Sequence, residues 1–355
     1  MKLSLRSHPL NLIRVIPAEE VMVAKFQILL AVVLSVFGMV NLNAEDPILV
    51  INTYDSFVAE WGAGPKIAPL FEKATGIKIK FVSKGDGGQL LSTLMLEGGN
   101  SEADIALGLD NFLAPKALGT GLFRAYRPVG YEAISKGLRT DPTARLIPFD
   151  YGNFAIVWDS AKLANPPTSL EDLTRSEYAK KLILMDPRTS TPGLGFLAWT
   201  KAAYGTAWRD YWRRLRPSVL MLAPGWDQGY GLFTAGEAPL VLSYATDGAY
   251  HLEFEKSERY KAIAFTDGFV RQIETAGILI KAKHPGNAEK FMDFLISASC
   301  QRELPLTQWM YPVNPTITLP DSFRAAVKPV KTLEVNVAGL TDDALEAVDI
   351  LSSSS

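Results

Sequence analysis

The sequence contains few of the residues that metal and redox chemistry requires. Its 355 residues include one cysteine, Cys300, and three histidines. A single cysteine cannot form an internal disulfide, and it excludes cysteine-based zinc sites and iron–sulfur clusters held by this chain alone. Lys and Arg number 36 against 38 Asp and Glu, so no excess of positive charge points to nucleic acid or an anionic membrane. We therefore predict no metal site, no cofactor and no nucleic-acid partner.

The sequence also lacks the motifs of several common catalytic sites. It has no GxxxxGK[ST] phosphate loop, no HExxH zinc motif and no GxSxG nucleophile motif. Residues 85–88 read Gly-Asp-Gly-Gly, but Leu90 stands where the dinucleotide fingerprint requires its last glycine. Cys300 lies in an apolar stretch with helical spacing, and His251 lies in a predicted helix. We predict packing roles for both, no catalytic residue, and a protein that is not an enzyme.

The composition and the order of predicted elements indicate a two-domain α/β protein. Hydrophobic residues make up 48% of the chain, which suffices for a large core, and the length suits two domains of roughly 150 residues each. Short apolar strands alternate with helices through short connections, and the pattern restarts after residues 127–145. This alternation is typical of parallel sheets covered on both faces. Such sheets bind ligands beyond the carboxyl ends of their strands.

The predicted elements follow from hydrophobic periodicity and from Gly, Pro and Ser at their ends. We predict strands at 48–54, 77–82, 103–107, 154–158, 182–185 and 240–244. Helices are predicted at 64–76, 86–96, 170–172 and beyond, 192–204, 208–212 and 285–296. Gly76 is the predicted end of the first helix, and Ser169 is the predicted N-cap of the third.

The N-terminal segment has the features of an export signal. Residues 28–40 are almost entirely apolar, and a run of this length is short for a membrane span but fits the core of a signal peptide. We predict a signal peptide over residues 1–44, with Met22 as the true start. Because no cysteine follows the run directly, we expect no lipid anchor and a location in the periplasm.

Aromatic and acidic residues recur just after the predicted strands. Tyr54-Asp55-Ser56 follows the first strand, Asp86-Gly87-Gly88 the second, and Tyr244-Ala245-Thr246-Asp247 the last. Trp61, Trp226 and Trp309 add indoles in turn-like contexts. An aromatic face attracts a desolvated cation by about 1–2 kcal/mol, and a carboxylate supplies the counter-charge. The pattern predicts a flat cationic heterocycle as ligand, with core packing as the alternative for any single aromatic.

A hydroxyl-rich segment precedes another predicted helix. Thr189-Ser190-Thr191 stands directly before Pro192-Gly193. Hydroxyls and free backbone N–H groups at a helix N-terminus attract phosphate or carboxylate groups. Ordinary N-capping explains the same residues, so both interpretations stay open.

Several longer motifs occur in a consistent order between residues 48 and 333. They are TYDSF (53–57), WGxGP (61–65), LGLDN (107–111), PFDYG (148–152), DPRTSTPGLG (186–195), LVLSY (240–244) and WMYPV (309–313). Together they resemble the periplasmic thiamine-binding proteins of bacterial thiamine ABC transporters. The resemblance implies a two-lobed type II periplasmic-binding-protein fold, with a mostly parallel sheet flanked by helices in each lobe and the ligand cleft between the lobes. One lobe is expected to comprise residues 45–147 and 249–355, and the other residues 148–248.

The resemblance also implies the ligand and its contacts. Thiamine, or its mono- or diphosphate, is expected in the cleft, with Asp86 and Gly87 contacting it. Ser190 and Thr191 are expected to meet the phosphate or the hydroxyethyl end. The other implied contacts are Tyr54, Trp61, Trp226, Tyr244, Ala245, Thr246, Asp247, Tyr250 and Trp309. Asp247 departs from the family pattern, which has a serine there.

The implied mechanism is transport without chemistry. The lobes are expected to close by hinge bending at residues 148–150 and 243–244, and a monomer is expected to deliver the ligand unchanged to a membrane permease driven by a separate ATPase. Two alternatives remain at this point. The first is a binding protein for a polyamine or for iron, because binding proteins for those ligands share this architecture. The second is a thiamine-degrading enzyme of the same fold class. The enzyme would need a cysteine nucleophile near the cleft, and only Cys300 is available.

Overall fold

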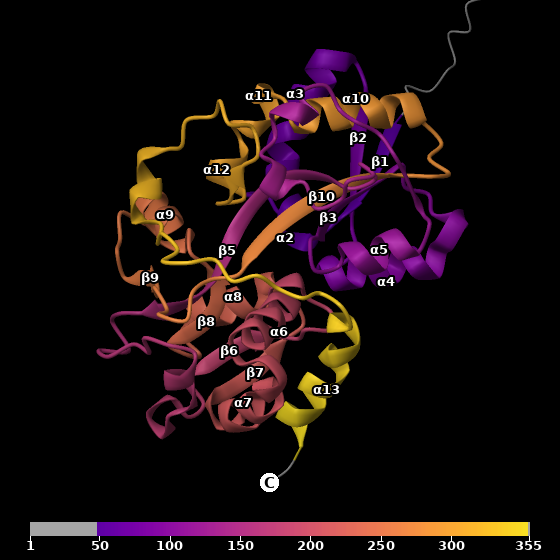
Figure 1. Cartoon of the computed structure of the whole chain (residues 1–355). Helices are drawn as coiled ribbons and strands as arrows, with labels where there is room; N and C mark the ends of the chain where they lie inside the picture. Colours follow the sequence, from indigo (N-terminus) through magenta and orange to yellow (C-terminus); the bar gives the residue numbers. More distant parts are fainter. Residues whose placement is uncertain (1–47, 354–355) are drawn as a thin grey trace, which may run out of the picture. The chain divides into compact units, whose positions relative to one another are not determined.

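A single mixed sheet extends through the described part of the chain, residues 48–353, in this computed structural model (Figure 1). This part forms an 11-stranded sheet with the order β2-β1-β3-β10-β5-β8-β6-β7, and β4, β9 and β11 pair with strands of this path. The strands are β1 (Ile48–Thr53), β2 (Lys78–Ser83), β3 (Ile105–Asp110), β4 (Phe123–Arg124), β5 (Ile147–Asp159), β6 (Leu182–Met185), β7 (Val219–Ala223), β8 (Leu240–Tyr244), β9 (Tyr260–Ala262), β10 (Arg271–Leu279) and β11 (Tyr311–Pro312). The predicted signal peptide, 1–44, lies outside the described residues.

Strand β5 joins the two halves of the sheet. Its residues 147–153 pair with β10 and its residues 154–158 pair with β8, both antiparallel. We call β1–β4, β10, β11 and their helices the first half, and β6–β9 and their helices the second half. The other long strands are parallel within each half, so the predicted α/β class with mostly parallel sheets is confirmed. The antiparallel β5 and β10 at the centre were not predicted as such.

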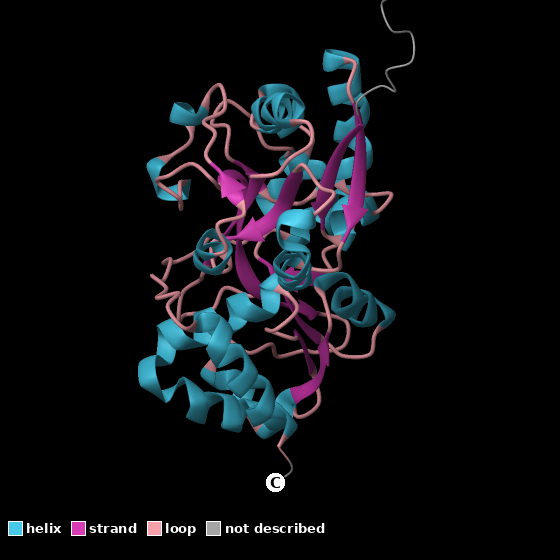
Figure 2. Ribbon diagram, turned by 90° about the vertical axis from the view of Figure 1, so that its right-hand side faces the viewer, coloured by secondary structure: helices cyan, strands magenta, loops and turns pink. Residues whose placement is uncertain are grey.

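Helices cover both faces of the sheet (Figures 1 and 2). The helices are α2 (Asp55–Val58), α3 (Ala63–Thr75), α4 (Gly87–Glu97), α5 (Ala114–Gly119), α6 (Thr191–Tyr204), α7 (Trp208–Leu215), α8 (Trp226–Ala235), α9 (Asp247–Tyr250), α10 (Pro285–Leu295), α11 (Ala298–Gln301), α12 (Leu304–Thr307) and α13 (Leu340–Ser352). In the first half, α3 and α10 share a core with Leu49 and Ile51 of β1, whereas α4 and α5 share a core with Ala106 and Leu109 of β3. The two faces of this half of the sheet therefore pack against different helical layers.

The helix ends near the cleft follow from local sequence. Gly76 ends α3 with φ 74°, a left-handed conformation in which glycine carries no steric penalty. Asp86 caps α4 in a capping box with Gln89, which satisfies N–H groups that a helix start leaves unpaired. The cap places the Asp86 carboxylate at the edge where the two halves meet.

The C-terminal segment completes the second half. Helix α13 packs against α6 and α7, where Leu340 and Ala347 are buried. Arg209 of α7 donates to Glu346 of α13 at 2.6 Å, and Lys201 pairs with Asp343. The segment is thus docked on the second half. The predicted lobe boundaries, 45–147 with 249–355 and 148–248, stay a prediction.

Most predicted elements are present, with differences at a few places. Strands β6 and β8 have the predicted bounds. Ser169 does accept a hydrogen bond from the Asp172 N–H (3.1 Å), but it precedes only the short 3₁₀ helix Glu171–Thr174. No strand is predicted over β7 or β10. Within residues 48–353, no helix is long and apolar enough to cross a membrane.

Candidate ligand-binding cleft

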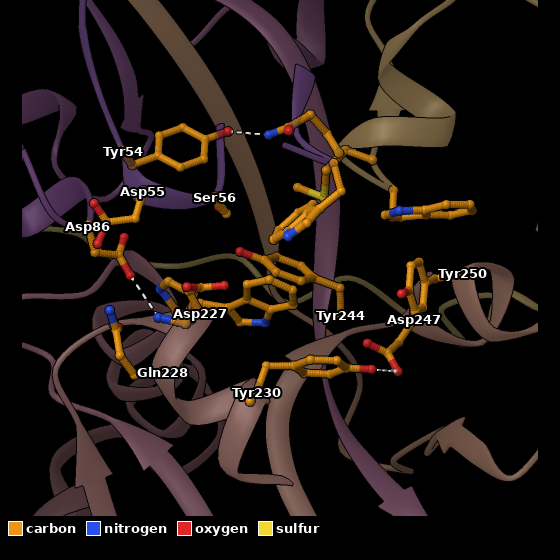
Figure 3. Close-up of a pocket in the computed structure, with 18 of the residues that line it drawn as sticks. Tyr54, Asp55, Ser56, Asp86, Asp227, Gln228, Tyr230, Tyr244, Asp247 and Tyr250 are labelled. Carbon is orange, nitrogen blue, oxygen red and sulfur yellow. Dashed lines mark hydrogen bonds between the residues drawn. The ribbon is translucent and has the colours of Figure 1, made fainter. Parts of the chain in front are cut away.

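A cavity of about 340 Å³ lies where the two halves of the sheet meet. Its first wall consists of residues that follow β1 and β2, and its second wall consists of the starts of α6, α8 and α9 together with Tyr244 at the end of β8. The segment 308–310, which follows α12, closes a third side. In Figure 3, Tyr54 and Asp86 lie on one side of the cavity, Tyr230 lies on the other, and Tyr244 lies between them. The cavity is therefore built from strand ends, as the fold class predicts.

Aromatic rings form much of the cavity surface. The Trp226 ring stacks on Tyr230, with centroids 4.8 Å apart and planes at 19°, because the two residues are one turn apart on α8. Trp61 meets the Trp226 ring edge-on at 6.4 Å. Trp309 contacts Tyr250 edge-to-face at 5.4 Å. Trp226 and Trp309 thus line one shared cavity.

The Asp86 carboxylate connects the two halves across the cleft. One oxygen accepts from the backbone N–H of Gly87 (2.6 Å) and so caps α4. The other accepts from the Ser190 hydroxyl (2.8 Å) and from the backbone N–H of Trp226 (3.1 Å), both in the second half. Burial raises the pKa of Asp86 above its ordinary value, while these hydrogen bonds oppose the shift. Asp86 is therefore both a helix cap and a bridge between the halves.

A hydrogen-bonded chain supports the Trp226 ring from behind. Its indole N–H donates to Ser243 Oγ (3.1 Å), and Ser243 donates to Asp247 Oδ1 (3.1 Å). The Tyr230 hydroxyl donates to Asp247 Oδ2 (2.9 Å) and lies 2.7 Å from His251 Nε2. The chain fixes the position and tilt of both stacked rings.

His251 completes this chain at the far end. The residue is fully buried, and its Nδ1 lies 2.8 Å from an oxygen of Glu255. Burial raises the pKa of Asp247 to about 6, although the nearby His251 and the hydrogen bonds from Tyr230 and Ser243 favour its ionised form. The predicted packing role of His251 is therefore incomplete, since its ring also makes polar contacts.

A buried acidic residue, Glu274, lines part of the cavity. The Tyr54 hydroxyl donates to Glu274 Oε2 (2.8 Å), and Gln308 donates to the Tyr54 oxygen. Glu274 belongs to β10 and is only 7% exposed. Burial raises its pKa to about 7, in opposition to the hydrogen bond from Tyr54.

Acidic groups dominate the charge of the lining. The acidic lining residues are Asp55, Asp86, Asp227, Asp247, Glu255 and Glu274. No Lys or Arg occurs among the described residues that line the cavity. Low-dielectric walls strengthen a field of one sign, so the cavity attracts a cation. Within residues 48–353 no group of three or more His, Cys, Asp or Glu is placed to hold a metal ion.

Most of the site residues predicted from the sequence line this cavity. They are Tyr54, Trp61, Asp86, Thr191, Trp226, Tyr244, Thr246, Asp247, Tyr250 and Trp309. Thr246 is fully buried, and its hydroxyl has no hydrogen-bond partner among the described residues. That these side chains bind a ligand stays a prediction, but the structure brings them together.

Three predicted site residues lie outside the lining. Gly87 packs between the halves, where an added Cβ would lie 2.4 Å from Thr191 Cγ2. Ser190 is 1% exposed and its hydroxyl is bonded to Asp86. Ala245 is fully buried in a small cluster with Phe269, because its side chain points away from the cavity. In this structure Gly87 packs closely against the second half, Ser190 donates to Asp86 across the cleft, and Ala245 packs in the core.

Sequence reasoning missed several lining residues. Glu274 lies inside an otherwise buried strand, and a carboxylate in such a strand is the signal that could have singled it out. Tyr230 could have been found from its spacing of four residues after Trp226 on α8. Gln308 and Glu255 carried no comparable signal, since only tertiary packing brings them to the cavity.

The chain is similar to solute-binding proteins over most of its length. The family model described as bacterial extracellular solute-binding protein matches residues 52–301. A thiamine-binding periplasmic protein of Brucella abortus is 45% identical over 306 residues, which is 84% of this chain and 90% of that protein. The protein of the same name from Escherichia coli K12 is 44% identical over 294 residues, covering 82% of this chain and 88% of that protein.

Solved structures show the same relationship. A structure titled periplasmic thiamin binding protein superposes with a TM-score of 0.80 at 40% identity, covering 86% of this chain and 96% of that one. A ferric binding protein from Campylobacter jejuni superposes with a TM-score of 0.71 but only 21% identity, covering 85% of this chain and 98% of that one. The second match shows the shared fold alone.

Proposed function

We propose that this chain captures thiamine for an ABC importer. The premise is its family: the chain belongs to the bacterial extracellular solute-binding proteins, and within them it groups with the periplasmic thiamine-binding proteins. Relatives of 44–45% identity carry the name thiamine-binding periplasmic protein. Their similarity covers nearly the whole described chain. The proposed role is to bind thiamine in the periplasm and release it unchanged to a membrane permease that a separate ATPase drives.

The single observation that supports this ligand most strongly is the combination of stacked rings and acidic groups, without Lys or Arg, in one cavity. Thiamine carries a fixed positive charge on its thiazolium ring and a second, flat aminopyrimidine ring. The Trp226 and Tyr230 stack offers an aromatic face, and the lining offers carboxylates without Lys or Arg. A cation over such a face gains about 0.5–2 kcal/mol, more where water is excluded.

The proposed binding cycle uses closure of the two halves around the ligand. Asp86, Ser190 and Trp226 join the halves by hydrogen bonds, and β5 passes from pairing with β10 to pairing with β8 without a break. A change of backbone angles near residues 148–150 and 243–244 would open the cavity while leaving both cores intact. We propose that the closed form is what the permease recognises.

Degradation of thiamine is the alternative that the position of Cys300 disfavours. Its thiol is fully buried and does not line the cavity. Burial also raises the pKa of the Cys300 thiol, which disfavours the nucleophilic thiolate. We therefore propose a binding protein that has no catalytic step and needs no cofactor.

Isothermal titration calorimetry of the purified chain tests the proposal. Thiamine, thiamine monophosphate and thiamine diphosphate are titrated separately, with spermidine and ferric citrate as probes of the two rival ligand classes. We expect micromolar or tighter binding of at least one thiamine form and quenching of tryptophan fluorescence, because Trp226 and Trp309 line the cavity. Binding of spermidine or iron without any thiamine binding would refute the proposal, and mass spectrometry of the recovered thiamine would reveal any cleavage.

A further inference from the structure

Two buried carboxyl groups lie side by side on the central strands next to the cavity. Asp150 of β5 and Glu274 of β10 are directly opposite each other in the antiparallel pairing, so their side chains share one face of the sheet. Asp150 is fully buried and Glu274 is 7% exposed. Glu274 lines the cavity, whereas Asp150 is not among the lining residues.

The hydrogen bonding of this pair is incomplete if both groups are ionised. Glu274 accepts a hydrogen bond from the Tyr54 hydroxyl (2.8 Å). Neither oxygen of Asp150 receives a hydrogen bond from any described residue. A buried carboxylate without donors costs several kcal/mol, and two adjacent buried carboxylates cannot both hold their charge. A proton on Asp150 gives that group a hydrogen bond to Glu274, but it leaves the charge of Glu274 buried with no Lys or Arg in the lining.

The groups around the pair supply no positive charge. Those that face it are Tyr54 after β1, Asp86 at the start of α4, Asp110 at the end of β3, Tyr244 at the end of β8 and Cys300 on α11. All are acidic or neutral. Burial and the neighbouring Glu274 raise the pKa of Asp150 well above its ordinary value, and burial raises the pKa of Glu274 to about 7. The empty cavity therefore lacks a cation that would hold Glu274 ionised near neutral pH.

We propose that Glu274 is the counter-charge for the cationic ligand, that it carries a proton in the empty cavity, and that it releases this proton to solvent when the cation enters. Asp150 is a positioning residue that stays protonated and donates to the Glu274 carboxylate. No bond of the ligand changes, since a proton leaves Glu274 and the fixed charge of the ligand takes its place. This inference rests on the proposed capture of a cationic ligand.

The expected linkage follows from the sign of the exchange. Ligand binding that requires ionised Glu274 releases up to one proton below pH 7 and almost none at pH 8. If the group titrates near pH 7 in the empty cavity, the Kd for thiamine should be about tenfold weaker at pH 6 than at pH 8. The thiazolium charge is permanent, so it contributes nothing to this change.

Calorimetry of the full chain with thiamine, at pH 6, 7 and 8 and in buffers of different ionisation enthalpy, measures the number of protons released. Glu274→Gln should abolish the release and the pH dependence and weaken binding at least tenfold at pH 8. Asp150→Ala should shift the pH dependence of the Kd to higher pH, because Glu274 loses a hydrogen-bond donor. Asp150→Asn should restore the original pH dependence, because an amide N–H replaces the O–H of the protonated acid. The matched control is Asp104→Asn, a buried acid that neither lines the cavity nor faces the pair, and it should keep the release. Asp110→Asn tests the buried acid that does face the pair.

The outcomes separate the two proposals. Absence of any thiamine binding would overturn the proposed function, whereas binding of thiamine without proton release at pH 6 would overturn only the role of Glu274. Loss of the proton release in Asp110→Asn but not in Glu274→Gln would place the proton on Asp110, and this result would also overturn the role of Glu274. If Glu274→Gln does not fold, the buffer dependence of the unmodified chain still decides the question.

Discussion

Removal of the Asp86 carboxylate is the sharpest test of how this protein couples its two halves to its ligand. The side chain lines the cavity, caps α4 and accepts hydrogen bonds from Ser190 and Trp226 across the cleft. Asp86→Ala removes all of these contacts. Asp86→Asn keeps an oxygen that can cap the helix but loses the charge. Comparison of the two variants separates capping from the bridge between the halves.

The magnitude can be worked from the contacts. The bonds from Ser190 (2.8 Å) and Trp226 (3.1 Å) each involve a charged acceptor, and such bonds contribute about 1.5–3 kcal/mol. Loss of an N-cap costs about 1 kcal/mol. Burial of Asp86, which raises its pKa, offsets part of the gain. We expect Asp86→Ala to lower the free energy of unfolding by about 3 kcal/mol and Asp86→Asn by about 1 kcal/mol.

Urea unfolding gives the stability, and calorimetry with thiamine gives the Kd. The matched control is Asp141→Ala, since the Asp141 carboxylate accepts backbone hydrogen bonds from Arg145 (2.7 Å) and Leu146 (3.1 Å) within the first half. This variant should lose stability yet keep the Kd, whereas Asp86→Ala should weaken the Kd at least tenfold, about 1.4 kcal/mol. Equal changes of Kd in the two variants, or unaltered stability of Asp86→Ala, would contradict a bridge between the halves at Asp86.

Three further predictions concern the rings, the buried acid and the C-terminal helix. Trp226→Ala should weaken thiamine binding by about 1–3 kcal/mol in calorimetry, and Trp226→Phe by less, because a smaller aromatic face remains. The raised pKa of Glu274 means that the unfolded chain loses this proton first, so this group lowers stability as pH rises from about 4.5 to 7. In urea unfolding, the free energy of unfolding of Glu274→Gln relative to that of the unmodified chain should rise by up to about 3 kcal/mol between pH 4 and pH 8. A difference between the two chains that stays constant with pH would contradict the raised pKa of Glu274. Deletion of residues 340–352 should lower the free energy of unfolding by about 4 kcal/mol, since Leu340, Ala344, Ala347 and Val348 of α13 are buried. Thermal unfolding measures this loss, and the Kd for thiamine should not change because α13 does not line the cavity.

Local patterns in the sequence were sufficient for much of the fold. The apolar runs of β6 and β8 predicted their bounds, and Gly76 and Asp86 marked the end of α3 and the start of α4. These features depend on side-chain alternation and on backbone conformations that neighbouring residues impose. Strand β10 is not predicted, since its polar residues interrupt the apolar pattern. Its central, antiparallel place depends on partners more than 100 residues away.

The candidate site likewise has residues that could be predicted from the sequence and contacts that could not. The residues that follow strands, such as Tyr54, Asp86 and Tyr244, could be predicted because the carboxyl ends of parallel strands converge at one edge of a sheet. The use of Ser190 as a bridge to Asp86 could not be predicted, because its rotamer and partner depend on how the halves meet.

The α/β class, the family and a set of residues that converge on one cleft follow from the amino-acid sequence. Only the folded chain shows that Glu274 faces the cavity with Asp150 beside it, and that Tyr230 and His251 hold the Trp226 ring in place. The reason is physical: periodicity and capping are properties of neighbouring residues, whereas burial and the proton content of a carboxyl group depend on side chains that distant segments bring together.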